Sequence, residues 1–254
     1  MTRFVSEGLT HHYEVHGSGR PVVMLHGAGV TFTGNFGVCG WIDRFNDHGF
    51  QVIGLDMRGH GESDPPHDPS ASGIEPLARD VVALLDHLAV ERAAVVGYSI
   101  GSAIALHVLH TYPERVRAGA LVAAGDGLIG VPPMRFDEMM PGLVDILVRH
   151  EYPADLPPHQ AMYWTFSTQV AGGRDGVAMM ARGDFPPCTP GEAGAIEVPV
   201  LVVSGENDPV LGTGARLAES LPKGRYVEIA GGDHFSLAVD ESVQNTVAEF
   251  LAAD

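Results

Sequence analysis

Continuous apolar runs of strand length set the strongest limit on how this chain can fold. Six such runs recur along the sequence, at residues 22–25, 52–55, 93–96, 120–123, 200–203 and 226–229. The first five are continuous rather than alternating, which is typical of strands covered on both faces of a parallel sheet. Stretches with helical apolar spacing lie between them. Because strands and helices alternate, the sequence predicts βαβ units with right-handed crossovers and a doubly wound α/β sheet.

Two parts of the chain depart from this alternation. Residues 3–16 alternate between apolar and polar side chains, which indicates antiparallel edge strands. Residues 126–197 contain three Pro-Pro pairs and six of the nine Met residues, among short helical stretches. We therefore expect residues 1–125 and 198–254 to form the core domain and residues 126–197 a helical cap. Met is adaptable packing material, so this cap either lines an apolar pocket or only packs onto the core, and Met139 and Trp164 are its candidate substrate contacts.

Composition limits the partners that we expect. The chain has 15 Lys and Arg against 32 Asp and Glu, a formal net charge of −17. This charge repels phosphate backbones and anionic lipid, so we expect a small-molecule substrate and neither nucleic acid nor a membrane.

Signal-peptide and membrane-spanning patterns are not found in the sequence. Cys39 and Cys188 form no disulfide framework or zinc motif, so we expect a cytoplasmic protein with no metal or cofactor. The sequence leaves the oligomeric state open.

A serine lies at a sharp turn between a predicted strand and a predicted helix. The pentapeptide Gly97-Tyr98-Ser99-Ile100-Gly101 follows the apolar run 93–96 and begins a helical segment. Such a turn tolerates only small neighbours and exposes the serine oxygen at the carboxyl end of the sheet. The N–H groups at the start of the following helix favour negative charge there. Ser99 is therefore the predicted nucleophile.

A serine hydroxyl needs a base to take its proton and a carboxylate to orient that base. Asp208 follows the run 200–203, and His234 follows the run 226–229. Each is predicted to emerge at the same sheet edge as Ser99. The order Ser, Asp, His is that of α/β-fold hydrolases. Asp126, after the run 120–123, is a rival for the acid, and Asp233 ranks third.

Together, these motifs resemble the serine-nucleophile branch of the α/β-hydrolase superfamily over nearly the whole chain. The matching blocks are the loop His26-Gly27-Ala28-Gly29, the turn 56–63 with the pattern D-x-R-G-x-G-x-S, the Ser99 turn, and the Asp208 and His234 loops. The resemblance implies an eight-stranded, mostly parallel sheet flanked by helices, with the cap inserted between strands six and seven. It also implies an oxyanion hole formed by the N–H groups of Ala28 and Ile100, and Gly29 ranks below them as a candidate donor. The resemblance further implies that His26 and Arg58 are structural supports.

The resemblance leaves several activities open. A serine nucleophile favours a small, partly apolar carboxylic ester, thioester or lactone as substrate. Besides the cap residues, Gly29, Tyr98 and Phe235 are the expected substrate contacts. The alternatives are a carbon–carbon bond hydrolase, a non-hydrolytic lyase or cyclase, and a small-molecule receptor with residual hydrolase activity, because one fold serves many chemistries. Ile100 stands where carbon–carbon bond hydrolases usually carry Met, which weakens the first of these alternatives.

Overall fold

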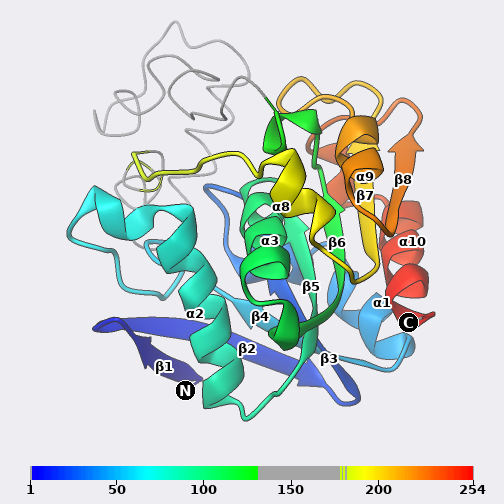
Figure 1. Cartoon of the computed structure of the whole chain (residues 1–254). Coiled ribbons are helices and arrows are strands. Elements are labelled where there is room, and N and C mark those ends of the chain that lie inside the picture. The colour runs from blue at the N-terminus through cyan, green and yellow to red at the C-terminus, as the bar shows by residue number, and fades with distance from the viewer. Residues whose placement is uncertain (1, 131–177, 179, 181, 254) are drawn as a thin grey trace, which may run out of the picture.

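The sheet has eight strands in the order β1-β2-β4-β3-β5-β6-β7-β8 (Figure 1). A computed structural model describes residues 2–130, 178, 180 and 182–253. The strands are β1 (Arg3–Ser6), β2 (Leu9–Gly17), β3 (Arg20–Leu25), β4 (Phe50–Leu55), β5 (Ala93–Tyr98), β6 (Val116–Val122), β7 (Val200–Gly205) and β8 (Gly224–Ile229). β1 and β2 are antiparallel to their neighbours, and the other strands pair in parallel. The predicted fold class and the antiparallel edge are confirmed.

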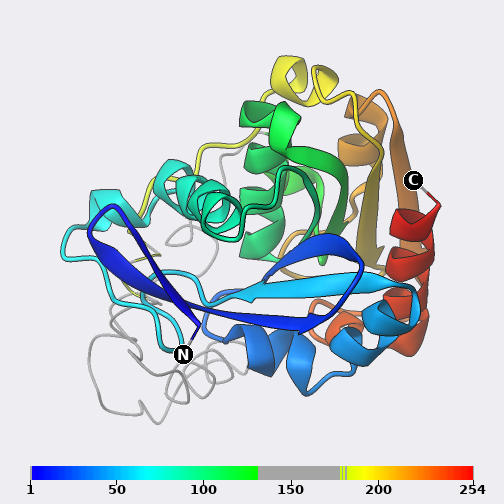
Figure 2. The same cartoon turned by 90° about the horizontal axis from the view of Figure 1, so that it is seen from below.

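Helices cover both faces of the sheet, as Figure 2 shows from below. The longer helices are α1 (Trp41–Asp47), α2 (Ile74–His87), α3 (Ile100–Thr111), α9 (Ala215–Ser220) and α10 (Glu241–Ala252). Short turns complete the described part: the π-helical turn η1 (Thr33–Gly37), the 3-10 turns η2 (Pro69–Ser72), η3 (Pro113–Arg115), η4 (Asp126–Leu128) and η5 (Ser236–Ala238), and the helix α8 (Pro190–Gly194). Within the described ranges, every helix is too short or too polar to cross a lipid bilayer.

Each central strand sends alternate side chains into two separate cores. Val23 and Leu25 of β3 belong to the core that α2, α3 and α9 cover, whereas Val22 and Met24 belong to the core that α1 and α10 cover. Because both faces are covered, the strands can be apolar at every position, which explains the continuous apolar runs. The doubly wound arrangement places the carboxyl ends of β5, β7 and β8 at one edge, and the loops that leave this edge carry the predicted site.

The described ends of the predicted cap lie against the main core. Ala193 and Ile196 are buried in the same cluster as α2 and α3, and Phe185 packs against it. Cys188 donates its N–H to the carbonyl oxygen of Leu128, which joins the two ends at 2.8 Å. Residues 131–177, including Met139 and Trp164, lie outside the described residues, so the cap and these two substrate contacts stay predictions.

Candidate active site

The turn between β5 and α3 holds Ser99 in a backbone conformation that few residues adopt. Its φ of 56° and ψ of −119° lie outside the regions that side chains ordinarily favour. A side chain at Gly97 would collide with the carbonyl of Gly101, and one at Gly101 would collide with the carbonyl of Leu25. The two glycines therefore let α3 begin directly against the neighbouring strand ends, and this close packing fixes the serine at the sheet edge.

Ser99, His234 and Asp208 form one hydrogen-bonded line. Ser99 Oγ lies 2.8 Å from His234 Nε2, and His234 Nδ1 lies 2.8 Å from Asp208 Oδ2. All three residues are buried: Ser99 and Asp208 are 8% exposed, and His234 is 1% exposed. With the imidazole proton on Nδ1 donated to the carboxylate, Nε2 is free to accept the serine proton. The structure thus brings together the three residues that the sequence selected.

Asp208 is held in its ionised form by its surroundings. Its Oδ1 accepts the N–H groups of Val210 and Leu211 at 2.7 and 3.0 Å. Burial raises the pKa of Asp208, but the hydrogen bond and electrostatic attraction of His234, with these two N–H groups, outweigh burial and hold that pKa below its ordinary value. The carboxylate is therefore available to orient His234 near neutral pH.

Neither rival carboxylate approaches the imidazole in this way. Asp126 accepts the N–H of Leu217 at 3.0 Å, in the first turn of α9. Asp233 accepts the N–H groups of Phe235 and Ser236 at 2.9 and 2.8 Å, which closes the loop around His234. Both carboxylates thus stabilise backbone turns, and Asp208 is the carboxylate that bonds to His234 Nδ1.

A cavity of about 240 Å³ opens in front of Ser99 and His234. Its described lining is mostly apolar and includes Ala28, Tyr98 and Phe235, with Asn35 as a polar member. Tyr98 was expected to contact substrate, but its hydroxyl donates to the carbonyl oxygen of His234 at 2.6 Å. Burial raises the pKa of this phenol, so it stays a donor. Tyr98 therefore offers its ring to the cavity and uses its hydroxyl to hold the histidine loop.

The two predicted oxyanion donors flank the serine. Ala28 lines the cavity beside Ser99. Ile100 is the first residue of α3, where backbone N–H groups have no acceptor within the helix. Gly29 differs from its expected role, because it is absent from the described cavity lining and its N–H donates to His60 Nε2 at 3.3 Å. This contact occupies the Gly29 N–H, and the role of Gly29 as a substrate contact stays a prediction.

Asn35 is a site residue that sequence reasoning missed. Its Oδ1 accepts the N–H of Gly27 at 2.8 Å, and its side chain is buried at the cavity wall. This bond holds the peptide group between His26 and Gly27, next to Ala28 in the loop. Asn35 lies in η1, outside every recognised motif, so only the folded loop reveals it.

Two buried histidines fasten the same loop to the turn at residues 56–63. His26 donates from Nδ1 to the carbonyl of Gly27 at 2.7 Å and accepts the N–H of Met57 on Nε2 at 3.0 Å. His60 lies 3.2 Å from the carbonyl of Arg58 through Nδ1 and accepts from Gly29. Both imidazoles are therefore neutral and use both nitrogens, as the predicted supporting role of His26 requires.

Arg58 holds the turn at residues 56–63 in place through a buried ion pair. Its guanidinium pairs with the Asp80 carboxylate through two hydrogen bonds of 2.7 and 2.6 Å. Both side chains are only 1% exposed. The pair ties the turn at 56–63 to α2, in keeping with the supporting role expected of Arg58.

The histidine pair predicts a loss of stability in mild acid. Burial lowers the pKa of His26 to about 4 and that of His60 to about 3. Between these values and about 6.5 the unfolded chain binds protons that the folded chain does not. The contribution of the two neutral imidazoles to the free energy of unfolding is therefore complete above pH 6.5. As pH falls below this value, each histidine lowers the free energy of unfolding by about 1.4 kcal/mol per pH unit.

Urea unfolding at pH 7, 6 and 5 measures this slope. The variant His60→Gln is the matched comparison, because an amide keeps a donor and an acceptor but does not titrate in this range. As pH falls, the free energy of unfolding of the variant should decrease less steeply than that of the unmodified protein. The difference between the two slopes should be about 1.4 kcal/mol per pH unit. Equal slopes in the two proteins would show that His60 is not kept neutral by the fold.

Metal ligation finds no support in the described ranges. Among these residues, no three His, Cys, Asp or Glu side chains gather closely enough to hold an ion. The buried polar groups of the site bond to one another and to backbone.

Comparison with known proteins identifies the family of this chain. The family model for the alpha/beta hydrolase fold matches residues 20–175, more than half of the sequence, and the chain therefore belongs to the α/β-hydrolase family. A second model, described as TAP-like protein, matches residues 179–253. The predicted family is thus confirmed.

Individual relatives have several hydrolytic activities. A 2-hydroxy-6-oxo-6-phenylhexa-2,4-dienoate hydrolase from Comamonas testosteroni is 38% identical over 125 residues, which are 47% of this chain and 41% of that protein. The match thus spans about two fifths of that relative. The solved enol-lactonase from Burkholderia xenovorans is 26% identical with a TM-score of 0.76, covering 98% of this chain and 99% of its own. Est816, described as an N-acyl homoserine lactone degrading enzyme, is 27% identical with a TM-score of 0.74, covering 97% and 98%.

Proposed function

We propose that this protein is a serine hydrolase that cleaves a small, partly apolar carboxylic ester, thioester or lactone through an acyl-enzyme intermediate. The observation that carries the proposal is the line of 2.8 Å contacts from Ser99 through His234 to Asp208, beside a mostly apolar cavity. Nucleophile, base and orienting acid in this geometry are the parts that acyl transfer requires.

In the proposed mechanism, Ser99 Oγ attacks the carbonyl carbon while its proton passes to His234 Nε2. The oxygen that becomes negative accepts the N–H groups of Ala28 and Ile100. When the intermediate collapses, the bond to the leaving group breaks and that group takes the proton from His234. Water then gives a proton to His234 and attacks the acyl carbon. Ser99 leaves with that proton, and the carboxylic acid is released.

The walls of the cavity favour an uncharged acyl group. The described lining contains no Lys or Arg, and its polar side chains other than the reacting pair are Asn35, Cys39 and Tyr98. Against this described part of the lining, a carboxylate on the acyl group would lose its hydration without a cationic partner. The likeness to an enol-lactonase and to a lactone-degrading enzyme supports an ester or lactone as substrate.

Carbon–carbon bond hydrolysis is the second candidate. It is favoured by the 38% identity to the Comamonas dienoate hydrolase. The same Ser99, His234 and Asp208 would serve it, so substrate tests distinguish the two reactions.

Acyl-chain length tests the apolar cavity. In a series of p-nitrophenyl esters from acetate to hexanoate, each added methylene should contribute up to about 0.8 kcal/mol, a gain of up to about fourfold in kcat/KM, until the cavity is full. The hydrogen succinate ester, of similar length to the butyrate ester, is the charged control and should react more slowly.

Three results would contradict the proposal. Turnover below about 0.1 s⁻¹ on every ester and lactone would indicate a receptor rather than an enzyme. Rapid cleavage of a 2-hydroxy-6-oxo-dienoate with slow ester hydrolysis would favour the carbon–carbon reaction. Indifference to acyl length would indicate that the cavity does not hold the acyl group.

A further inference from the structure

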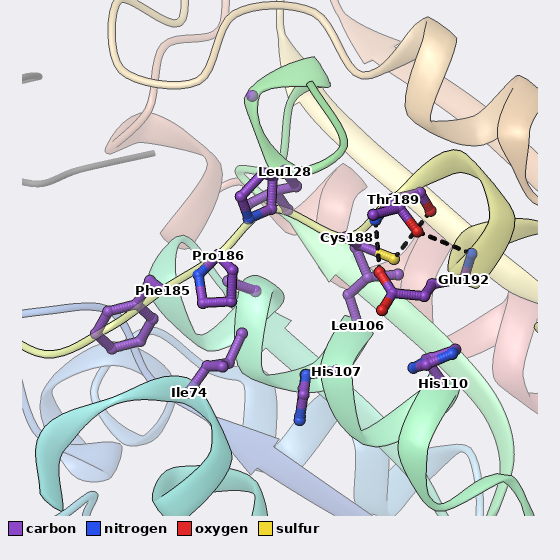
Figure 3. A pocket seen from close by; sticks show the side chains of 13 residues that line it. Ile74, Leu106, His107, His110, Leu128, Phe185, Pro186, Cys188, Thr189 and Glu192 are labelled. Atoms are coloured by element: carbon purple, nitrogen blue, oxygen red, sulfur yellow. Dashed lines mark hydrogen bonds between the residues drawn. The ribbon is translucent and has the colours of Figure 1, made fainter. Parts of the chain in front are cut away.

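A second cavity lies between α2, α3, η4 and the segment that leads into α8 (Figure 3). Its volume is about 190 Å³, and its described lining shares no residue with that of the catalytic cavity. Four lining residues come from α3, the helix that begins after Ser99. Nothing in the proposed reaction uses this cavity.

The outer wall of the cavity is held in a fixed position. It consists of Phe185 and the residues that follow, up to the start of α8. The Cys188 N–H bonds to the Leu128 carbonyl at 2.8 Å, and Thr189 and Glu192 cap α8 reciprocally at 2.7 and 3.2 Å. Pro186 and Pro187 restrict the backbone further. The cavity is therefore formed before any ligand arrives.

The size of the cavity fits a single ring with one short substituent. An apolar protein cavity of about 150 Å³ is known to accommodate benzene. The extra volume here leaves room for one or two further heavy atoms.

The lining is apolar on one side and polar on the other, as Figure 3 shows. Ile74, Pro186 and Phe185 lie together at the left of the view, and Glu192 and His110 lie at the right. A ligand that satisfies both sides has an apolar body and one polar end.

The polar side offers mainly hydrogen-bond acceptors. The N–H and side chain of Thr189 hold the pKa of Glu192 below its ordinary value, so its carboxylate is ionised at neutral pH. His107 Nε2 lies 2.7 Å from Glu75, and donation of its proton there leaves Nδ1 as an acceptor in the neutral ring. The complementary ligand end is therefore a donor.

Two other chemistries fit the cavity poorly. Burial and the Glu192 carboxylate raise the pKa of the Cys188 thiol to about 11, so it remains protonated and a weak nucleophile. His107, His110, Cys188 and Glu192 belong to no metal-holding group among the described residues.

We propose that this cavity binds a small primary ammonium ion carried on an apolar body of one ring, with the ammonium group facing Glu192. The carboxylate supplies a charge-assisted acceptor, and the net charge of −17 attracts cations to the molecule. The proposal does not depend on the hydrolytic reaction.

Titration of the full-length protein with three matched probes at pH 7 tests this site. Benzylamine should bind at least about tenfold more tightly than benzyl alcohol, and benzoate should bind least, because ionic hydrogen bonds exceed neutral ones. Amide NMR shifts should move at Leu106, Cys188 and Glu192 and stay in place at Ala28 and Val239. Equal affinity for the three probes, no binding at millimolar concentration, or shifts confined to the catalytic cavity would each overturn the proposal.

The variant Glu192→Gln removes the charge and retains the cap of α8, because Gln serves in a capping box as Glu does. Its affinity for benzylamine should fall about tenfold, while its affinity for benzyl alcohol stays the same. Glu219→Gln, at an exposed position in α9, is the control for net charge and should bind benzylamine as the unmodified protein does. Unchanged benzylamine binding by Glu192→Gln would overturn the assignment of the ammonium group to Glu192.

Discussion

Replacing Ser99 with Ala is expected to lower kcat on a preferred ester by about 10⁴–10⁶, with the fold unchanged. Residues that act together in acyl transfer lose nearly all of their effect when one is removed. The hydroxyl is replaced by hydrogen at an edge of the cavity, so little packing is lost. Steady-state kinetics and urea unfolding on the same preparation measure both effects.

A second buried serine provides the control for this variant. Ser204 lies at the end of β7 and bonds through Oγ to the Tyr226 hydroxyl at 2.7 Å, away from the described cavity lining. Ser204→Ala should keep kcat within a few-fold. If Ser99→Ala retained a tenth of the original rate, the covalent mechanism would be wrong.

Asp208→Asn is expected to lower kcat by about 10⁴. The amide keeps the size of the carboxylate but can donate a proton to Nδ1, which stabilises the imidazole tautomer that cannot accept from Ser99. The N–H groups of Val210 and Leu211 favour an oxygen at Oδ1, so the new NH₂ group faces His234. The loss should appear in kcat more than in KM.

Asp126→Asn is the matched comparison. Its remaining carbonyl oxygen can still accept the Leu217 N–H, so activity should stay near that of the unmodified protein. A large loss in Asp126→Asn, with Asp208→Asn nearly normal, would move the acid to the loop after β6.

The sequence predicts a site residue well where a local motif and the order of strands and helices along the chain indicate the same position. Ser99 was predictable because the glycines on either side permit only one kind of turn, and β5 and α3 are recognisable from their apolar spacing. The choice between Asp208 and Asp126 was harder, since both follow parallel strands and reach the same edge. The His234 contact of 2.8 Å decides it.

Other features depend on contacts between distant parts of the chain. The Asn35 bond to Gly27, the His60 bond to Gly29 and the Tyr98 bond to His234 belong to no local pattern. Side-chain partners of this kind are set by how loops pack, which strand and helix periodicity does not encode. The cavity beside Glu192 is likewise visible only after α8 has packed near α3.

The order of the site residues along the chain has a consequence for protein synthesis. Ser99 leaves the ribosome 135 residues before His234. At translation rates of about 5–20 residues per second, roughly 7 to 27 seconds pass between them. During that interval the turn between β5 and α3 can form with β3, β5 and β6, while His234 is still missing. A nascent chain therefore carries an unactivated serine, and hydrolytic competence begins only when β7 and β8 have joined the sheet.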